Sequence, residues 1–522
     1  MPLKKFLANF KPLSRKGAQK TSRRKEIFKD AGIYTVSSYG AQLFDVVNGV
    51  LVRRFLGPAN MGIWSFLQIV LNYAKHSGLG VTMATARDVP YFRGKGDLAK
   101  AEEVKNLVFS FTLITAVLGA IGIVLFACLN RSRYSRPIFY GLVVVAILIV
   151  LQRLYNLYTV LLRAHKEFIF AGSLNFLSSV SSVLLTLVLT WKFKLYGFFV
   201  SLILNYLFTI AVILFRTPYR FAFFLSLKPL LPLLSLGSAV LISDMLKTVL
   251  TSIDRILITK YLGFKALGIY SIALMASNYL YSLPNMLGII FFPHFQEVLA
   301  ERDNTADLGK FLKEPTLCLA YFFPCLIGLV WIFSSWFVPL LLPEYVSGIT
   351  ALKYLSLGAF FLALTHPYSM FIITIRKHWQ LIPLQGGAVV FGFGVTWLFI
   401  QRGGGIGGVA IAGILISGVY FLILSIVSLK RIYNWSETLF LYLKVFGAFA
   451  YSSASLYLVD HLFHSLKIGL GRSLLEYFVF LISMMPLFIF AENEVRVLST
   501  LWRMAQPLFQ GGRGGEEEHP AL

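Results

Sequence analysis

A stripe of polar residues runs along one face of an otherwise apolar segment in the middle of the chain, and it limits the folds that are possible. Six positions at helical spacing form the stripe: Asp244, Lys247, Thr248, Thr251, Asp254 and Arg255. An ionisable side chain at the centre of a membrane helix costs about 2.5–3.5 kcal/mol. Such a face is therefore expected to look into protein or into a water-filled space rather than into lipid.

The same stripe recurs in a weaker form 206 residues earlier. The equivalent positions are Ser38, Ala41, Gln42, Asp45, Asn48 and Gly49. The segments that follow the two stripes also match, because RRFLGPANMGIWS at 53–65 corresponds to TKYLGFKALGIYS at 259–271. The chain therefore contains an internal repeat, and a polar cavity between two related halves indicates a transporter.

Two glycines recur at fixed spacing within the matching segments, Gly57 and Gly62 in the first copy and Gly263 and Gly268 in the second. They predict a tight turn with positive φ between two membrane spans. Each repeat unit holds six predicted spans, so both copies enter the membrane in the same orientation. The halves are expected to be related by a pseudo-two-fold axis along the membrane normal, with the stripes of spans 1 and 7 facing each other across a cleft.

The composition places the chain in a membrane. Hydrophobic residues make up 57% of the 522 positions, charged residues make up 14%, and the mean hydropathy is +0.72. Repeated apolar segments of about 20 residues predict an all-α polytopic membrane protein. About 14 transmembrane helices are expected, within 31–52, 61–84, 106–129, 138–162, 168–191, 196–215, 230–258, 266–293, 315–342, 346–375, 381–400, 406–428, 438–458 and 473–491.

These spans predict two six-helix bundles, or lobes, followed by two additional helices. The expected divisions are a basic cytoplasmic tail (1–30), an N-terminal lobe (31–216), a C-terminal lobe (217–430), two additional transmembrane helices (431–491) and a second cytoplasmic tail with a disordered end (492–522). The connection at 294–314 is expected to form a cytoplasmic amphipathic helix.

The net charge of +24 is concentrated at the N-terminus, where ten of the 48 Lys and Arg residues lie in the first 29 positions. The positive-inside rule predicts that this tail lies on the cytoplasmic side of the cell inner membrane. With an even number of spans, the C-terminus is then expected on the same side. The tail lacks interleaved aromatic residues, so nucleic acid is not an expected partner. No cleavable signal peptide is visible.

Basic residues within the spans, together with polar neighbours, form the candidate substrate-binding cavity. Lys and Arg donate to phosphate oxygens, and amide and hydroxyl groups bond sugars, so such a cavity suits a large polar anion. The candidates are Lys75, His76, Asn72, Gln42, Lys247, Arg255, Asn278 and Arg153. Lys353 and Lys444 also lie in or near spans, and Lys444 is close enough to an end to reach the interface.

Structural interpretations remain open for several of these residues. Asp244 and Lys247 are i, i+3 neighbours that could form a buried ion pair. Asp254 could pair with Lys247 or with Arg153. His76 could be a hydrogen-bonded packing residue or a proton carrier.

Three carboxylates, Asp45, Asp244 and Asp254, are candidates for binding a coupling H⁺ or Na⁺, because a buried carboxylate can titrate near neutrality. No Walker loop, Asp-x-Asp metal motif or pair of catalytic carboxylates is recognisable in the sequence. Neither catalysis nor a cofactor nor a resident metal is therefore expected.

The repeated motif (DRILITKYLGFKALGIYS at 254–271 and its partner at 48–65), the basic N-terminus and the span count resemble the polysaccharide-exporter branch of the multidrug/oligosaccharidyl-lipid/polysaccharide exporter superfamily. The resemblance implies an O-antigen, lipopolysaccharide or exopolysaccharide flippase. Its substrate would be a polyprenyl-pyrophosphate-linked oligosaccharide, moved from the inner to the outer leaflet by rocking lobes, with other polysaccharide assembly proteins as a further class of partner. In the related lipid II flippases spans 13 and 14 form a groove for the lipid tail, and 438–491 match them by position.

Three rivals are open. A lipid II flippase would be the same machine with a different cargo. A multidrug exporter of the superfamily would favour an acidic cavity, which the intramembrane basic residues argue against. A membrane polymerase or ligase of surface glycans would carry a long outer catalytic loop, and the predicted outer loops are short.

Overall fold

The structure is a computed structural model that describes residues 18–302, 308–375, 377–430 and 432–495. The regular structure in the described part of the chain is entirely helical, and no strand occurs there. The predicted class, an all-α polytopic membrane protein, is therefore confirmed. Most of the predicted tails, at 1–17 and 496–522, lies outside the described residues.

The N-terminal half begins with one long helix that bends sharply and holds the first predicted span and most of the second. Its elements are α2 (Ala18–Ala74), η1 (Lys75–Gly78), α3 (Thr82–Gly94), α4 (Leu98–Leu129), α5 (Arg136–Ala164), α6 (Phe168–Leu185), the π-helical turn η2 (Thr186–Thr190) and α7 (Trp191–Arg216).

The C-terminal half repeats this order and then adds further helices. Its elements are α8 (Leu227–Leu250), α9 (Ile253–Tyr261), α10 (Gly263–Arg302), α11 (Leu308–Leu341), η4 (Pro343–Gly348), α12 (Ile349–Thr374), η5 (His378–Gln380), α13 (Leu381–Gln401), α14 (Gly405–Leu429), α15 (Trp435–Leu462), α16 (Leu470–Ser483) and α17 (Met485–Val495).

Eight helical segments are long and apolar enough to cross a membrane, or nine when the bent pair α16 and α17 counts as one span, among the residues that the structure describes. One of the eight, Phe168–Arg216, holds two predicted spans. The helices that carry the polar stripes and their partners, α2, α8, α9 and α10, are not among them. The predicted count of 14 is compatible with this set.

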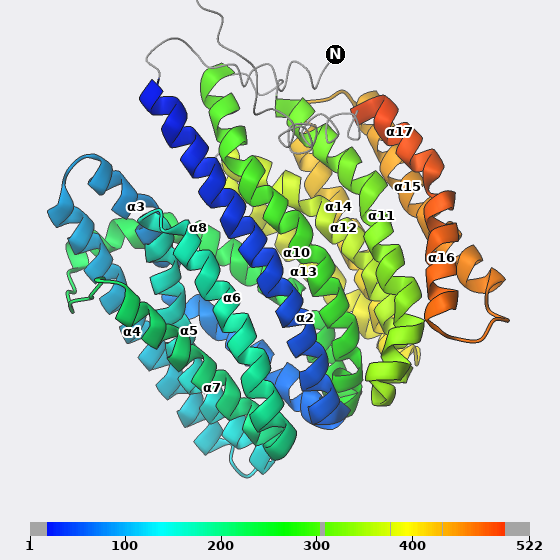
Figure 1. Ribbon diagram of the computed structural model, residues 1–522, viewed down its shortest axis with the longest axis horizontal. Helices are drawn as coiled ribbons and strands as arrows, with labels where there is room; N and C mark the ends of the chain where they lie inside the picture. The colour runs from blue at the N-terminus through cyan, green and yellow to red at the C-terminus, as the bar shows by residue number, and fades with distance from the viewer. Residues whose placement is uncertain (1–17, 303–307, 376, 431, 496–522) are drawn as a thin grey trace, which may run out of the picture.

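The two ends of the bundle are named here by α2. The near end is where α2 begins, and the far end is where it bends, at the bottom of Figure 1. In that view α3–α7 lie to the left, α11, α12 and α14–α17 lie to the right, and α2 and α10 cross the molecule between them. The lobes therefore meet along helices of the two polar stripes and their immediate successors.

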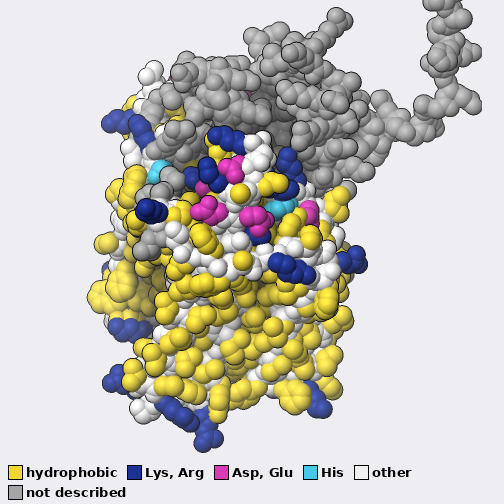
Figure 2. Space-filling model, turned by 90° about the vertical axis from the view of Figure 1, so that its left-hand side faces the viewer, with side chains coloured by type: hydrophobic (Ala, Val, Ile, Leu, Met, Phe, Trp, Pro, Cys, Tyr) yellow, Lys and Arg dark blue, Asp and Glu magenta, His cyan; other side chains and the backbone are white. Residues whose placement is uncertain are grey.

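A broad apolar surface covers the face formed by the N-terminal lobe. Figure 2 shows this band below a layer of charged side chains, with a thin basic rim at the far end. Exposed apolar side chains such as Leu118, Leu125 and Val188 belong to the helices of this lobe. An apolar belt between two charged layers is the surface of a protein embedded in lipid.

The first glycine of each repeated motif lies where the sequence predicts a turn. Gly57 bends α2 with a φ of 68°, and Gly263 is the first residue of α10, with a φ of 84°. Both angles lie in the left-handed region that favours glycine. The prediction of positive φ is confirmed at these two positions.

For the second glycine of each motif the prediction of a turn residue was wrong, because Gly62 and Gly268 lie inside helices where α2 and α10 cross. A Cβ added at Gly62 would lie 1.7 Å from the carbonyl oxygen of Phe264, and one added at Gly268 would lie 1.7 Å from that of Pro58. Positions 62 and 268, and 58 and 264, are both 206 residues apart. The contact is therefore symmetric about the pseudo-two-fold axis, and glycine is needed because two backbones touch.

Two spans predicted as continuous are broken. Span 2 ends as α2 at Ala74 and resumes as α3 after a turn in which Leu79 has a φ of 48° and Gly80 a φ of 73°. Span 7 breaks between α8 and α9 at Thr251 and Ser252. The stripe from 244 to 255 is consequently shared by two helices.

The connection at 294–314 is not a separate amphipathic helix. Residues up to Arg302 continue α10, and α11 begins at Leu308. Helix α2 likewise begins at Ala18, within the segment predicted as a tail.

Candidate functional site

Two hydrogen bonds related by the repeat join the lobes on the near-end side of the glycine crossing. Gln42 Nε2 of α2 donates to Ser282 Oγ of α10, and His76 Nε2 lies 2.8 Å from Thr248 Oγ1 of α8. Position 248 is the repeat equivalent of 42, and 282 is that of 76. The stripes of spans 1 and 7 were predicted to face each other. In the structure the stripe of span 1 contacts span 8, and the stripe of span 7 contacts span 2.

Part of the α2 stripe faces its own lobe. Asn48 Nδ2 donates to Ser182 Oγ of α6 over 2.9 Å. Asp45 lies beside the hydroxyl of Ser179, also on α6, and near Tyr279 of α10. The carboxylate of Asp45 is thus surrounded by hydroxyl groups and has no basic partner within 4.0 Å among the described residues.

Lys247 forms the centre of a polar cluster within the C-terminal lobe. Its ammonium nitrogen lies 5.5 Å from the ring centroid of Tyr281 on α10, and it interacts electrostatically with Tyr420 and Asp244. Asp244 also interacts with His76. No carboxylate oxygen of a described residue lies within 4.0 Å of the Lys247 nitrogen, so Asp244 and Lys247 face the same space without forming a close ion pair.

Asp254 and Arg255 belong to the beginning of α9. Asp254 Oδ1 accepts from the backbone N–H of Arg255 over 2.7 Å and lies beside buried Tyr270. Arg255 Nη2 donates to the carbonyl of Thr251 over 2.8 Å, while its Nε lies 4.0 Å from Asp254 Oδ1. Both side chains therefore satisfy backbone groups at the break in span 7. The predicted pairs of Asp254 with Lys247 and with Arg153 are absent from the described residues, because Asp254 faces its neighbour Arg255.

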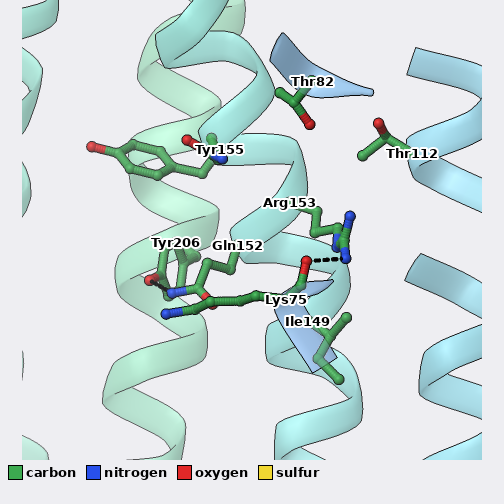
Figure 3. A pocket seen from close by; sticks show the side chains of 9 residues that line it. Lys75, Thr82, Thr112, Ile149, Gln152, Arg153, Tyr155 and Tyr206 are labelled. Atoms are coloured by element: carbon green, nitrogen blue, oxygen red, sulfur yellow. Dashed lines mark hydrogen bonds between the residues drawn. The ribbon is translucent and has the colours of Figure 1, made fainter. Parts of the chain in front are cut away.

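Lys75 and Arg153 line a cavity of about 360 Å³ that lies within the N-terminal lobe rather than between the lobes. The nine lining residues, none of them acidic, come from η1, α3, α4, α5 and α7: Lys75, Thr82, Thr112, Ile149, Gln152, Arg153, Tyr155, Asn156 and Tyr206. Figure 3 shows Lys75 extending toward Gln152 and Tyr206. The Lys75 ammonium donates to Asn72 Oδ1 over 3.0 Å.

Arg153 also caps the end of α2, a role that the sequence does not predict. Its Nη2 donates to the carbonyls of Ala74 and Lys75, over 3.1 and 2.5 Å, and to Ser77 Oγ over 2.9 Å. A Cβ at Gly78 would lie 1.8 Å from Arg153 Nη1. The guanidinium therefore occupies the place left open by the break in span 2. Asn278, predicted on the matching face of span 8, is exposed on α10.

Arg53 is a functional candidate that sequence reasoning missed. It is buried at the far end of α2, where Nε donates to Ser271 Oγ over 3.1 Å and Nη2 donates to the Ser271 carbonyl over 2.9 Å. Tyr345 donates to the Arg53 carbonyl. Arg53 thereby ties the lobes together beside the glycine crossing. It lies four residues after Gly49, on the face that carries Gln42 and Asp45, so the stripe itself carried the signal.

Two lysines of the C-terminal half, Lys353 and Lys444, have acidic partners. Lys353 Nζ of α12 lies 2.7 Å from Asp460 Oδ2 of α15, and Lys444 pairs with Glu494 of α17 instead of reaching the interface. Lys75, Lys247 and Arg153 have no carboxylate within 4.0 Å among the described residues. These three cations thus lack a close counter-charge among the described residues.

We expect Asp460→Asn to destabilise the protein by about 2 kcal/mol, because it leaves the mostly buried Lys353 ammonium without its counter-charge. The double variant Lys353→Met with Asp460→Leu should recover most of that loss, since it removes both charges. Thermal unfolding in detergent measures the effect. Strictly additive losses in the two single variants and the double variant would contradict the pairing.

No group of three or more His, Cys, Asp and Glu side chains suited to a metal occurs among the described residues.

Comparisons with known proteins bear on both fold and function. A sequence model of the family described as "Polysaccharide biosynthesis protein" matches residues 50–345, more than half of the chain. No protein in the curated collection of sequences matches the chain.

Several solved structures share the fold. The lipid II flippase MurJ in an inward closed conformation is 16% identical, with a TM-score of 0.64 over 88% of this chain and 99% of that one. An inward-facing MATE-family multidrug resistance transporter of the MOP superfamily is 16% identical, with a TM-score of 0.63 over 77% of this chain and 98% of that one. A MOP-superfamily transporter from Pyrococcus furiosus, described as having a binding pocket of reverse polarity, is 16% identical, with a TM-score of 0.57 over 78% and 95%.

Proposed function

The chain belongs to the polysaccharide biosynthesis protein family, and we propose that it is a flippase for a polyprenyl-pyrophosphate-linked oligosaccharide, the repeat unit of a surface polysaccharide. The cargo moves from the inner to the outer leaflet by alternating access. The near end faces the cytoplasm of the cell inner membrane, in accord with the ten basic residues that precede position 30.

The observation that carries this proposal is Lys247, which has no close carboxylate partner among the described residues and directly precedes Thr248, the contact of the C-terminal lobe with His76. A cation enclosed between membrane-embedded helices without a close carboxylate attracts an anionic head group. The hydroxyl-bearing rings of Tyr281 and Tyr420 stand beside it, and such rings can stack on sugars and bond their hydroxyls. An organic cation would be repelled by the same site, which disfavours a multidrug cargo.

The contacts between the lobes support alternating access. At the far end Arg53, Gly62 and Gly268 hold the lobes against each other, whereas among the described residues the hydrogen bonds between the lobes on the near-end side are those of Gln42, His76 and Tyr73. Rocking of the lobes about an axis in the membrane plane would then separate them at one end of the bundle while the contacts at the other end hold.

Coupling to H⁺ or Na⁺ is assigned here to Asp244. This carboxylate interacts with both Lys247 and His76, one from each half, so its charge state is felt by both lobes. Asp254 is engaged with backbone at the start of α9, and Asp45 is enclosed by hydroxyl groups.

A second candidate function, flipping of lipid II, is favoured by one observation. The match to MurJ covers 88% of this chain, whereas the matches to the MATE transporter and the Pyrococcus furiosus transporter cover 77% and 78%. The additional part of this chain that the MurJ match covers, about a tenth of its residues, is about the length of α15–α17.

Lipid mass spectrometry on the native host with the gene deleted tests the proposal. We expect a polyprenyl-pyrophosphate oligosaccharide to accumulate on the cytoplasmic leaflet, and its glycan then identifies the cargo. Accumulation of lipid II instead would establish the second candidate. An unchanged lipid-linked pool together with intact surface glycan would contradict both, and drug-efflux assays would follow.

A further inference from the structure

The far end of the N-terminal lobe carries a group of cations that the proposed function does not use. Five exposed basic residues, called here the basic rim, lie on the connection between α4 and α5 and at the beginning of α7: Arg131, Arg133, Arg136, Lys192 and Lys194. Figure 1 shows both segments at the far end. Figure 2 shows basic side chains along that end of the face, whereas the visible acidic side chains lie in the layer toward the near end.

No acidic residue compensates the charge of the basic rim. The sequence has no Asp or Glu between Glu103 and Glu167 or between Glu167 and Asp244, and both segments of the rim lie within these two intervals. Among the described residues, no carboxylate oxygen lies within 4.0 Å of any cation of the rim. Five like charges on one surface repel one another, so an anionic partner would lower their electrostatic energy.

The basic rim lies where the positive-inside rule disfavours basic residues. With the near end in the cytoplasm, as proposed above, the far end faces outward. Short outer loops that carry five Lys and Arg residues oppose the orientation that the N-terminal tail favours. Since these charges weaken the topological signal of the chain, they are expected to serve a purpose at the outer surface.

Exposed aromatic side chains are interleaved with these cations. Trp191 and Phe193 flank Lys192 in the sequence and are 66% and 54% exposed. Tyr140 of α5 and Tyr196 of α7 are also exposed and contact each other edge to face, with 6.2 Å between their ring centroids, so the two segments of the rim meet. Tyr and Trp concentrate at the level of lipid head groups, where a ring can be apolar on one side and hydrated on the other. The partner of the rim is therefore expected in the head-group layer.

Lys194 has a backbone conformation that favours glycine. Its φ of 52° and ψ of −129° interrupt the helix near the beginning of α7. A residue with a Cβ is strained at such angles. The residue is nevertheless a lysine, and its side chain is exposed. A charged side chain at a position where glycine would be more stable indicates that the ammonium group has a role at this surface.

We propose that the basic rim binds the head groups of anionic phospholipids in the leaflet at the far end, which is the outer leaflet in the orientation proposed above. Lys and Arg donate to the phosphate oxygens, and the aromatic rings lie between the acyl chains and the head groups. A soluble glycan or an acidic protein would approach from water and would not need the aromatic side chains between the cations. The inference rests neither on the cargo nor on transport.

Brominated phospholipids in proteoliposomes of the full-length protein test the proposal, because bromine quenches tryptophan fluorescence at short range and Trp191 lies in the rim. The emission that Trp191→Phe removes is the contribution of Trp191. Brominated phosphatidylglycerol is expected to quench this contribution more strongly than brominated phosphatidylcholine at the same bulk fraction. The difference should correspond to an enrichment beside the rim of at least about tenfold, and it should fall as the salt concentration rises.

Two variants of the rim should lose this preference. The combined substitutions Arg131→Gln, Arg133→Gln and Arg136→Gln should abolish it and leave quenching by phosphatidylcholine unchanged. Lys194→Gly should lower it about fivefold without lowering the melting temperature, because glycine adopts these backbone angles more readily. Lys194→Gly therefore replaces the triple variant if the triple variant does not fold.

The matched control removes three exposed cations at the near end, through Arg87→Gln, Lys95→Gln and Lys100→Gln. The change in charge is the same but lies away from Trp191, so the preference measured there should equal that of the wild type. Equal quenching by the two lipids in the wild type overturns the proposal, as does the same preference in the wild type and the triple rim variant. Equal quenching together with binding of oligogalacturonate that the rim substitutions abolish would assign the rim to an anionic glycan instead.

Discussion

Alanine at Gly62 or at Gly268 is expected to reduce transport more than tenfold. The added Cβ would lie 1.7 Å from a backbone carbonyl oxygen of the opposite lobe in either variant. No rotamer change can relieve a clash with backbone, so α2 and α10 must separate at the crossing and the far end cannot close. Because the two contacts are related by the pseudo-two-fold axis, the two variants should be impaired to a similar extent.

Gly122→Ala and Gly447→Ala provide matched controls. Both glycines lie in helices, α4 and α15, and a Cβ at either meets no atom within 4 Å. Alanine favours a helix over glycine by about 1 kcal/mol, so the controls should be neutral or slightly stabilised. Translocation of the lipid-linked glycan in proteoliposomes, normalised to folded protein, measures the effect. If the Gly62→Ala and Gly268→Ala variants are as active as the controls, close contact between α2 and α10 at the crossing is not required for transport.

The sequence predicts the helices and the internal symmetry well because both depend on local patterns. The apolar segments fall on the observed helices, and the offset of 206 residues between the stripes recurs in the contacts of Gln42 and Thr248. The positive φ of Gly57 and Gly263 also follows from the short-range pattern of the motif.

Features that depend on distant partners could not be predicted. The break in span 2 is satisfied by Arg153, which lies 78 residues beyond the Lys75 carbonyl that it binds. Likewise, the sequence predicts Gly62 as a turn residue, and only the structure shows that it is needed for contact with the backbone of Phe264. Hydropathy alone also gives no sign that Lys353 is neutralised by Asp460, 107 residues away, whereas Lys247 is not. Pairing of this kind is decided by the packing of helices.

Lys247→Gln is the substitution in the polar cluster of the C-terminal lobe with the largest expected effect on cargo transport. It removes the central cation of the cluster while keeping a polar side chain of similar reach, so the anionic head loses a charge-assisted bond in a poorly hydrated space. Translocation in proteoliposomes should fall at least about tenfold, mainly through weaker cargo binding. Lys247→Arg should retain part of the activity, since it keeps the charge with a different geometry.

The internal repeat gives a reason to expect that no other residue can take over the role of Lys247. The position equivalent to Lys247 in the first half is Ala41, which is buried on α2, so no symmetry-related cation can replace it. Lys353→Met with Asp460→Leu removes a lysine of α12 together with its partner and is the control for loss of a membrane-embedded charge. Transport by this double variant should match the wild type per folded molecule. Equal transport by Lys247→Gln and the wild type would remove Lys247 from the cargo path and leave the cavity of Lys75 and Arg153 as the remaining cationic site.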